Sequence, residues 1–482
     1  MTIESALLDI AIAPGNRIGG ARATLDRTQP VVDPATGNTI ADVPRSGQAE
    51  VNAAVAAAVA AQPAWAATSP QQRADILDRW AKLLADNADR LAAAATAEMG
   101  KILKESKGEV GRAITEIRFM SGEALRIDGQ TLPSVRPDTL VYTTRVPVGT
   151  VAAITPWNFP IVSPVRKIAP ALAAGDTVVV KPAEQSPLCA LLLVDLLQEA
   201  GLPDGVVNVV CGRGSEVGDA LVNHPDIKAV SFTGSTSVGR QISSAAGLRL
   251  IPVQLELGGK NAAYVDADAD LDRAVPEIVA ASIQATGQRC TAISRVIAHE
   301  SIADELITRI AEAYDLLTVG PGTDSVDVGP LVSEDARKSV AAYLDGAIAE
   351  GAEVVTKRTE VPSGPYLAPT LLDRVTPDMT VAREEVFGPV LAVIRVADAG
   401  EAIRVANDSE YGLAGSIFTR DIATALRYAN QLDTGMVHVN HGTSSQAHVP
   451  FGGAGASGLG PYSIGHAAQD FFTKVKVMYV SS

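Results

Sequence analysis

The chain has 482 residues, of which 47% are hydrophobic and 20% charged, and its formal net charge is -15 at pH 7. This length exceeds what one hydrophobic core usually organises, so two or more lobes are expected. The acidic balance argues against nucleic acid or an anionic membrane as a partner, because either requires a concentrated basic surface. The three cysteines, Cys189, Cys211 and Cys290, lie far apart and predict neither a disulfide framework nor a metal site.

The sequence carries no pattern that predicts export or membrane insertion. The N-terminus contains Glu4 and Asp9 and lacks the basic start and long apolar run of a secretory signal. The stretch 51–67 is rich in Ala and Val, but it is short and only weakly hydrophobic for a membrane span. We therefore expect a cytoplasmic protein.

In chain order, the first predicted region is helical. Apolar residues recur at helical spacing over 48–125. The segment 129–148 then exchanges Ala for Thr, Val and Pro, which predicts an extended hairpin arm. Short Val/Ile runs alternate with helical stretches after it, with strands expected at 150–154, 177–180, 206–210 and 229–232 and helices at 163–174 and 188–200. This alternation predicts parallel β-α-β units on an open, nucleotide-binding sheet.

A second alternating region runs from about 255 to 436, with strands expected at 261–265, 294–299, 353–355 and 390–396. Two α/β lobes with a cleft between them are therefore predicted. The tail at 471–480 is again extended. We expect it to pair with the arm at 129–148 and to contact another subunit, because neither segment has an obvious partner within its own lobe.

Three motifs carry the expected chemistry. The run GQRCT at 287–291 places Cys290 beside a glycine turn and next to Arg289, a cation that would favour the thiolate. By itself this run is weak evidence and is better explained by a small buried hydrophobe. The runs ELGGKN at 256–261 and TPWNFP at 155–160 change that interpretation, because with them the chain resembles the aldehyde dehydrogenase superfamily.

The resemblance extends over nearly the whole chain, from EMGK at 98–101 to PFGG at 450–453. It implies the α/β aldehyde dehydrogenase-like fold, with a Rossmann-like NAD(P)-binding domain at 1–128 and 149–252. An α/β catalytic domain is then expected at 253–435. A small β oligomerisation arm and the C-terminal tail, at 129–148 and 436–482, would join the chains in a homodimer or homotetramer.

The resemblance also assigns catalytic residues. Cys290 would attack the aldehyde carbon, and the Asn158 amide with the Cys290 N–H would hold the oxyanion. Hydride transfer to a nicotinamide would leave a thioester, and Glu256 would activate the water that hydrolyses it. Lys167 stands where the family has a lysine able to aid proton transfer, and the alternative for it is an ordinary helix cation.

The cofactor site is expected where the loop 232–239 follows a strand and opens a helix, since helix N-termini receive phosphates. A carboxylate at Glu184 suits ribose hydroxyls and repels a 2′-phosphate, so we expect NAD, with NADP as an alternative. For Lys181 and Glu184 the other interpretation is a pair of solvated charges. The resemblance implies cofactor contacts by Trp157, Lys181, Glu184, Gly234, Ser235, Gly239, Glu385 and Phe387.

The substrate pocket is expected to include Arg166, Ser445, Arg289 and Phe451. Succinic semialdehyde dehydrogenases resemble this chain in having arginine at the position of Arg166 and a serine that corresponds to Ser445. An arginine and a hydroxyl would suit a substrate carboxylate. Against this, a further arginine of those enzymes is replaced by Gln284, and Arg166 has the alternative of a surface helix cation.

We therefore expect oxidation of a short acid semialdehyde, succinic semialdehyde or 2,5-dioxopentanoate. An aromatic aldehyde is the alternative, because benzaldehyde-type relatives also have arginine at this position and, like this chain, lack a lysine at the position of Gly455. A route through coenzyme A does not need Glu256. A catalytically silent protein on the same scaffold is disfavoured because Cys290, Asn158 and Glu256 are all retained.

Overall fold

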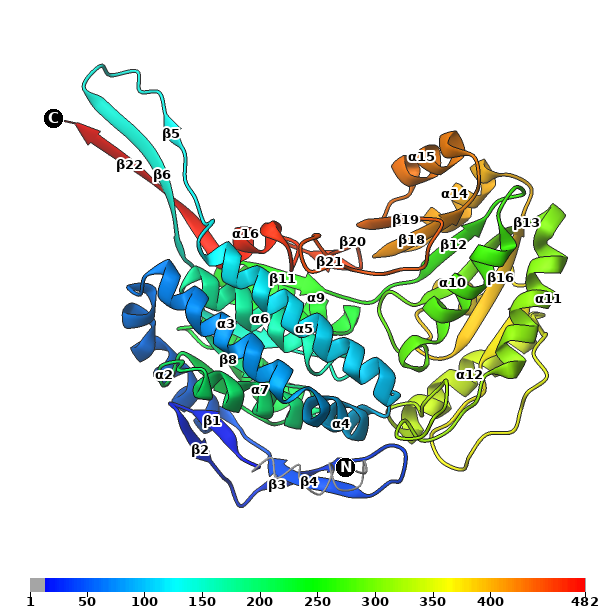
Figure 1. Ribbon diagram of the computed structural model, residues 1–482, viewed down its shortest axis with the longest axis horizontal. Coiled ribbons are helices and arrows are strands. Elements are labelled where there is room, and N and C mark those ends of the chain that lie inside the picture. The colour runs from blue at the N-terminus through cyan, green and yellow to red at the C-terminus, as the bar shows by residue number, and fades with distance from the viewer. Residues whose placement is uncertain (1–13, 482) are drawn as a thin grey trace.

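The computed structural model describes residues 14–481 and contains two large sheets, each covered by helices (Figure 1). Glu4 and Asp9, on which the expectation about a secretory signal depends, lie outside the described residues. Within residues 14–481, no helix has the length and apolar character needed to cross a membrane.

The first sheet has eight strands in the order β2-β1-β9-β8-β7-β10-β11-β21. Its five middle strands are parallel, and the outer strands pair antiparallel. In sheet order the strands are Ala21–Ala23, Asn16–Ile18, Val207–Val209, Thr177–Lys181, Thr150–Ile154, Ala229–Thr233, Val253–Glu256 and Gly458–Leu459. The strands predicted at 150–154, 177–180, 206–210 and 229–232 are thereby confirmed to within one or two residues.

Helices cover both faces of this sheet, and successive side chains of β7 point alternately to the two faces. Val151 and Ala153 pack into the core under α3 to α7, whereas Ala152 and Ile154 pack under α2, α8 and α9. Strands buried on both faces read as continuous apolar runs, which is why these were predictable. The helices are α2 (Gln48–Ala66), α3 (Pro70–Asp86), α4 (Ala88–Met99), α5 (Leu103–Ala124), α6 (Val162–Ala174), α7 (Pro187–Glu199), α8 (Asp219–Asn223) and α9 (Thr236–Arg249).

The second sheet has seven strands in the order β14-β15-β16-β13-β12-β18-β19, parallel except for β14. In sheet order they are Glu353–Val354, Thr370–Asp373, Val390–Val396, Ile293–His299, Asn261–Val265, Ala414–Phe418 and Met436–Val439. All four strands predicted for this region are present. The surrounding helices are α10 (Leu271–Ile283), α11 (Glu300–Leu316), α12 (Glu334–Glu350), α13 (Thr380–Arg383), α14 (Ala399–Asn407) and α15 (Ile422–Gln431).

A third, narrow sheet projects from the body as an arm (Figure 1). It pairs β22 (Thr473–Ser481) antiparallel with β6 (Thr139–Pro147), and β6 with β5 (Thr131–Leu132). The predicted pairing of the tail with the arm is confirmed. The short helix α16 (Gln469–Phe472) leads into β22.

Segments from different parts of the chain contribute strands to the same sheet, so the two lobes are not the continuous segments that the expected domain boundaries describe. Strand β11 begins at Val253 and belongs to the first sheet, and β21, from the tail, closes the edge of that same sheet. Strand β19, also in the segment expected to be tail, belongs to the second sheet. The N-terminal strands β1 to β4, with β3 at Thr28–Val32 and β4 at Thr39–Pro44, were not predicted. They are three to six residues long, which is too short for a clear period.

Candidate active site

A cavity of about 1550 Å³ opens where parallel strands of the first sheet end and the second lobe begins. Strands β8, β10 and β11 end at Lys181, Thr233 and Glu256, which all line it, as does Thr155 directly after β7. Open parallel sheets bind ligands at this edge. Of the predicted site residues, these line the cavity: Trp157, Asn158, Arg166, Lys181, Glu184, Gly234, Ser235, Glu256, Arg289, Cys290, Glu385, Phe387, Ser445 and Phe451. Lys167 and Gly239 do not.

The loop before Cys290 has an unusual backbone. Ala285, Thr286 and Gly287 all have positive φ, of 53°, 60° and 71°. Such a run is strained for residues with side chains, so its surroundings must hold it. The Glu105 carboxylate accepts from the Ala285 N–H at 2.9 Å, and the Thr286 hydroxyl donates to a carbonyl at 3.0 Å. The fold thus fixes the turn that presents Cys290 to the cavity.

Arg289 lowers the pKa of the Cys290 thiol, as expected, but effects of the opposite sign outweigh it. Burial raises the pKa of Cys290 to about 12, and the Glu256 and Glu385 carboxylates raise it further than Arg289 and Arg166 lower it. The Arg289 guanidinium donates to Gln284, and to Thr443 Oγ1 at 2.6 Å. The nucleophile therefore needs a base.

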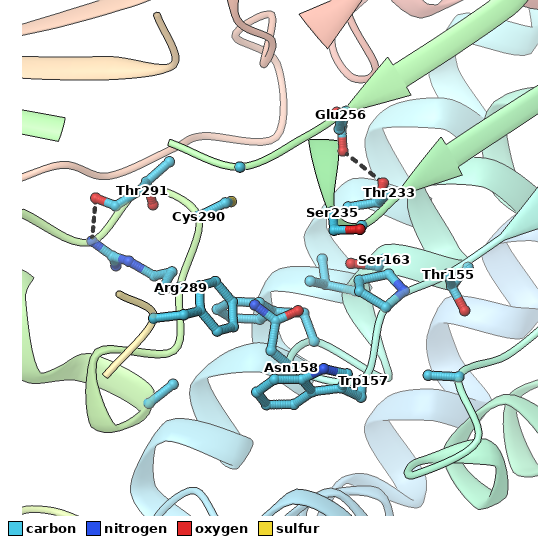
Figure 2. A pocket seen from close by; sticks show the side chains of 18 of the residues that line it. Thr155, Trp157, Asn158, Ser163, Thr233, Ser235, Glu256, Arg289, Cys290 and Thr291 are labelled. Carbon is cyan, nitrogen blue, oxygen red and sulfur yellow. Dashed lines mark hydrogen bonds between the residues drawn. The ribbon is translucent and has the colours of Figure 1, made fainter. Parts of the chain in front are cut away.

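Asn158 lies in the turn after β7 and borders the same part of the cavity as Cys290 and Glu256 (Figure 2). The Asn158 side-chain amide donates to the Gln288 backbone carbonyl at 2.8 Å. The backbone carbonyl of Asn158 accepts from Lys101 Nζ at 2.9 Å. Lys101 forms a buried ion pair with Glu109 at 2.5 Å. The run at 98–101 contributed to the family resemblance, but its role in anchoring Asn158 had no sequence signal.

Glu256 ends β11 with its side chain against the cavity. One carboxylate oxygen accepts from the Thr233 hydroxyl at 3.1 Å (Figure 2). The other oxygen is buried and finds no partner among the residues that the structure describes. A buried acceptor without a partner costs free energy, so this oxygen is suited to a water molecule in the cavity.

Lys167 lies on α6 and is buried behind the cavity wall, so it is not exposed to solvent as most lysines on a helix are. Its ammonium donates to the Ser231 hydroxyl at 3.0 Å, and Ser231 donates to Gln254 at 2.8 Å. Burial lowers the pKa of Lys167 to about 8, against the opposing effect of Glu256. Lys167 is near enough to influence Glu256 electrostatically, although it does not line the cavity.

The phosphate-side residues fit a dinucleotide. Helix α9 begins at Thr236, directly after Gly234 and Ser235, and the Ser235 hydroxyl caps it by accepting from the Val238 N–H. Gly239 lies against β11, where an added Cβ would come within 2.4 Å of the Leu257 side chain. A glycine there permits the close helix–strand packing that dinucleotide-binding folds require.

The residues expected to contact the two riboses of the cofactor line two other parts of the cavity. Lys181 is buried, which excludes the solvated-charge alternative for it, and Glu184 accepts from the Gly214 N–H at 2.9 Å. Burial raises the pKa of Glu385 to about 7, and its carboxylate accepts from the Gly259 N–H at 3.0 Å. Phe387 has φ 56° and meets Trp157 edge-on, with ring centroids 5.6 Å apart. The cavity is continuous from Cys290 to these groups, so the residues present fit NAD(P).

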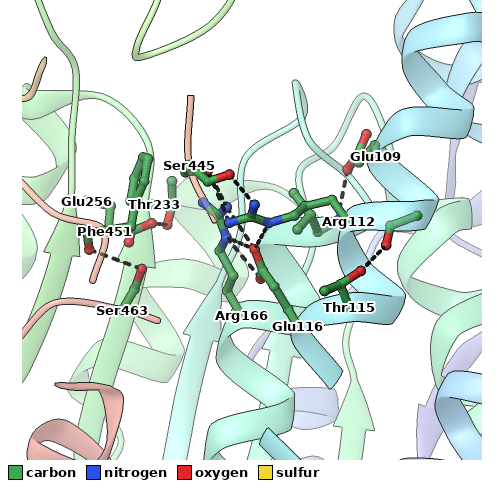
Figure 3. A network of polar contacts seen from close by, with 12 residues as sticks. Glu109, Arg112, Thr115, Glu116, Arg166, Thr233, Glu256, Ser445, Phe451 and Ser463 are labelled. Carbon is green, nitrogen blue, oxygen red and sulfur yellow. Dashed lines mark hydrogen bonds and ion pairs between the residues drawn. The ribbon is translucent and has the colours of Figure 1, made fainter. Parts of the chain in front are cut away.

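The substrate-side residues are not arranged as a free arginine and hydroxyl that await a substrate carboxylate. Arg166 is not open to a ligand from all sides, because its guanidinium forms an ion pair with Glu116 at 3.0 Å (Figure 3). The Ser445 hydroxyl is 3.5 Å from Arg166, and the Phe451 ring centroid is 4.7 Å from the guanidinium carbon. Burial opposes the charge of Arg166, but Glu116, Glu256 and Cys290 together more than offset that effect, and the pKa of Arg166 is raised. The surface-cation alternative for Arg166 is wrong.

The sequence analysis missed Arg112 and Glu116 on α5. Arg112 lines the cavity and donates to Glu116 at 2.6 Å and to the Ser445 hydroxyl at 3.3 Å (Figure 3). Their four-residue spacing is the only signal in the sequence, and it is common on any helix surface.

Comparison with known proteins agrees with this geometry. The profile of the aldehyde dehydrogenase family matches residues 21–478. The chain is 44% identical to a phenylacetaldehyde dehydrogenase of Pseudomonas fluorescens, over 96% of this chain and 95% of the relative. It is 39% identical to an alpha-ketoglutaric semialdehyde dehydrogenase of Bacillus subtilis (strain 168), over 93% and 94%.

A solved structure extends the likeness to the fold. The crystal structure of a betaine aldehyde dehydrogenase from Staphylococcus aureus in complex with NAD+ has a TM-score of 0.97 and 32% identity, covering 99% of this chain and 97% of that one. The chain therefore belongs to the aldehyde dehydrogenase family and is an NAD(P)-dependent enzyme.

Proposed function

We propose that the enzyme oxidises a short aliphatic aldehyde bearing a carboxylate, such as succinic semialdehyde or 2,5-dioxopentanoate, to the corresponding dicarboxylic acid, with NAD preferred. The observation that carries this proposal is the wall of the cavity at Arg166 and Ser445, where a guanidinium group and a hydroxyl offer hydrogen-bond donors. Guanidinium groups bind carboxylates through paired N–H donors. The Bacillus subtilis relative, named for such a semialdehyde, supports it.

The first step is addition of Cys290 to the aldehyde carbon. The thiol proton passes to a base, and Glu256 is the carboxylate that most strongly affects the pKa of Cys290. The developing oxyanion is held by the Asn158 amide and the Cys290 N–H, each worth about 3 kcal/mol of barrier in comparable sites. To donate, the Asn158 amide must turn from the Gln288 carbonyl or share its second N–H.

NAD(P), held by Lys181, Glu184, Ser235 and Glu385, would supply the acceptor for the hydride that leaves the tetrahedral carbon. Once Glu256 has passed the thiol proton to solvent, the resulting thioester on Cys290 is hydrolysed. The unpartnered oxygen of Glu256 orients and deprotonates the water. Lys167 lies buried behind this wall of the cavity, and burial lowers its pKa to about 8.

An aromatic aldehyde is the second candidate substrate. Phe159 and Phe451 both line the cavity, and aromatic rings favour a stacked or edge-on aromatic partner. The Pseudomonas fluorescens relative is named for such a substrate. The two candidates differ in charge, so kinetics separates them.

The test is NAD(P)H formation by the purified enzyme with four aldehydes, each with NAD and with NADP. These are succinic semialdehyde, 2,5-dioxopentanoate, phenylacetaldehyde and hexanal. We expect kcat/KM at least about tenfold higher for the two anionic aldehydes, since one charged hydrogen-bonded contact is worth roughly 1.5 kcal/mol or more. Preference for phenylacetaldehyde would replace the proposal with the aromatic one.

We further propose that the enzyme acts in the cytoplasm as a homodimer or homotetramer. The arm formed by β5, β6 and β22 carries exposed apolar side chains that a second copy would cover, among them Val475 and Tyr479.

A further inference from the structure

Two guanidinium groups in the cavity wall share one carboxylate. Glu116 Oε1 accepts from Arg112 Nε at 2.6 Å and from Arg166 Nη2 at 3.0 Å, and Glu116 Oε2 accepts from Arg166 Nε at 3.1 Å. The Glu116 side chain is only 3% exposed and does not line the cavity. Glu116 therefore lies behind the two arginines and is shielded from solvent.

The charge balance of this group decides what it can bind. Arg166 and Glu116 together are neutral, so Arg166 alone offers a substrate carboxylate hydrogen bonds but no net charge. Arg112 adds the second cation and gives the trio a net charge of +1. The Arg112 side chain is also the more exposed of the two, at 21% against 11% for Arg166. The net positive charge is therefore supplied by a residue that faces the cavity.

Both arginines converge on the same loop residue. Arg112 donates to the Ser445 backbone carbonyl and lies 3.3 Å from its hydroxyl, and Arg166 lies 3.5 Å from that hydroxyl (Figure 3). Two residues earlier in the same loop, the Thr443 carbonyl accepts from Arg289 at 3.0 Å. The hydroxyl and the two guanidinium groups thus form one polar corner of the cavity, beside the middle of α5.

We propose that Arg112 is a specificity-determining residue that binds the substrate carboxylate jointly with Arg166 and Ser445. This inference rests on the proposed oxidation of acid semialdehydes and names the group that supplies the charge. Glu116 fixes the two guanidinium planes, so the carboxylate enters a site whose donors are already oriented. Preorganised donors lose less conformational entropy on binding.

The test compares Arg112→Met with the wild-type enzyme on succinic semialdehyde and on butanal, which has the same carbon chain without the carboxylate. We expect KM for succinic semialdehyde to rise about tenfold or more, with kcat within about twofold, because the contact is lost equally from the ground state and the transition state. The constants for butanal should stay unchanged. Arg112→Lys keeps the charge without the planar fork, so it should restore part of the affinity.

Arg118→Met is the matched control. Arg118 lies on the same helix, is exposed and does not line the cavity. Its substitution therefore removes one arginine from α5 without changing the site. Its KM for succinic semialdehyde should equal that of the wild-type enzyme. Thermal unfolding of each variant shows whether Arg112→Met is folded, and Arg112→Lys retains a cation beside Glu116 if the methionine variant is not.

The outcomes separate this inference from the proposed function. If the wild-type enzyme does not prefer succinic semialdehyde over butanal, the proposed function is wrong. If the wild-type preference is present but Arg112→Met and Arg112→Lys both retain it in full, Arg112 does not bind the carboxylate. Equal losses on both aldehydes would make Arg112 a structural residue and would also overturn the inference.

Discussion

Glu256 has two carboxylate oxygens in different surroundings, and the difference bears on the order of the chemistry. The oxygen bonded to Thr233 orients the group, and the other has no partner among the described residues. Only the second is free to accept a proton from water. At the scale of one residue, the geometry therefore favours a role in hydrolysis of the thioester.

We predict that Glu256→Gln slows deacylation more than acylation. Steady-state turnover should fall by roughly 100-fold or more, the usual contribution of a general base. A burst of about one NADH per chain should remain, slower than in the wild type but faster than the steady state. Loss of the Glu256 charge lowers the pKa of Cys290 and so offsets part of the loss of the base that takes the thiol proton. Stopped-flow absorbance measures the burst, and intact-protein mass spectrometry detects the acyl group on Cys290. A first turnover slowed as much as the steady state, with no acyl group, would place Glu256 before hydride transfer instead.

At the scale of elements, Glu109 joins two helices and the turn that carries Asn158. It projects from α5, accepts from the Ile161 and Val162 N–H groups at 2.8 Å at the start of α6, and forms the buried ion pair with Lys101. Lys101 in turn donates to the Asn158 carbonyl. One carboxylate thus satisfies a helix N-terminus and fixes the position of the oxyanion donor.

We predict that Glu109→Gln destabilises the protein by about 3 kcal/mol or more, because it leaves the Lys101 ammonium buried without its counter-ion. Among molecules that remain folded, kcat should fall, since the Asn158 turn loses its anchor. Urea unfolding and steady-state kinetics measure the two effects. Asp86→Asn is the control, because it breaks the exposed Lys82–Asp86 pair and should cost less than about 1 kcal/mol. Equal stability of the two variants would contradict the anchoring role.

Elements with a strong pattern were predictable from the sequence, and contacts between distant elements were not. Helix α6 and strands β7, β8, β12 and β16 lie where the apolar pattern places them, because burial on both faces or on one stripe leaves a clear period. Strands β1 and β2 have three residues each and form on the edge of a sheet built by later strands. Their position depends on tertiary pairing that no local window contains.

In the candidate site, too, the residues with a motif were predictable from the sequence and the contacts between distant segments were not. Cys290, Asn158 and Glu256 were predicted through motifs and a family resemblance, and the structure brings them to one cavity. The high pKa of Cys290 depends first on its burial and then on the Glu256 and Glu385 carboxylates, and the ion pair of Arg166 depends on Glu116. Neither was predicted, because no local stretch of the sequence contains these contacts.

At the scale of the whole molecule, the arm is the feature that the single chain leaves incomplete. Strands β22 and β6 pair over nine residues from Thr473 to Ser481, yet the arm stands away from the body (Figure 1). On one face of β22, Val475, Val477 and Tyr479 are 59%, 49% and 73% exposed. A narrow, projecting sheet with exposed apolar side chains is marginal in water, so a second chain is expected to cover it.

We predict that the double variant Val477→Lys and Tyr479→Glu dissociates the assembly without unfolding the chain. Both side chains project from the arm, so the substitutions leave the two large sheets intact but add charges where apolar contacts are expected. Size-exclusion chromatography with light scattering should give a multiple of the 49.9 kDa chain mass for the wild type and a smaller multiple for the variant. Lys474→Glu together with Lys476→Glu, on the opposite and polar face of β22, is the matched control. A wild-type protein that is monomeric at micromolar concentration would show that the arm serves another purpose, and loss of assembly in the control alone would place the contact on the other face.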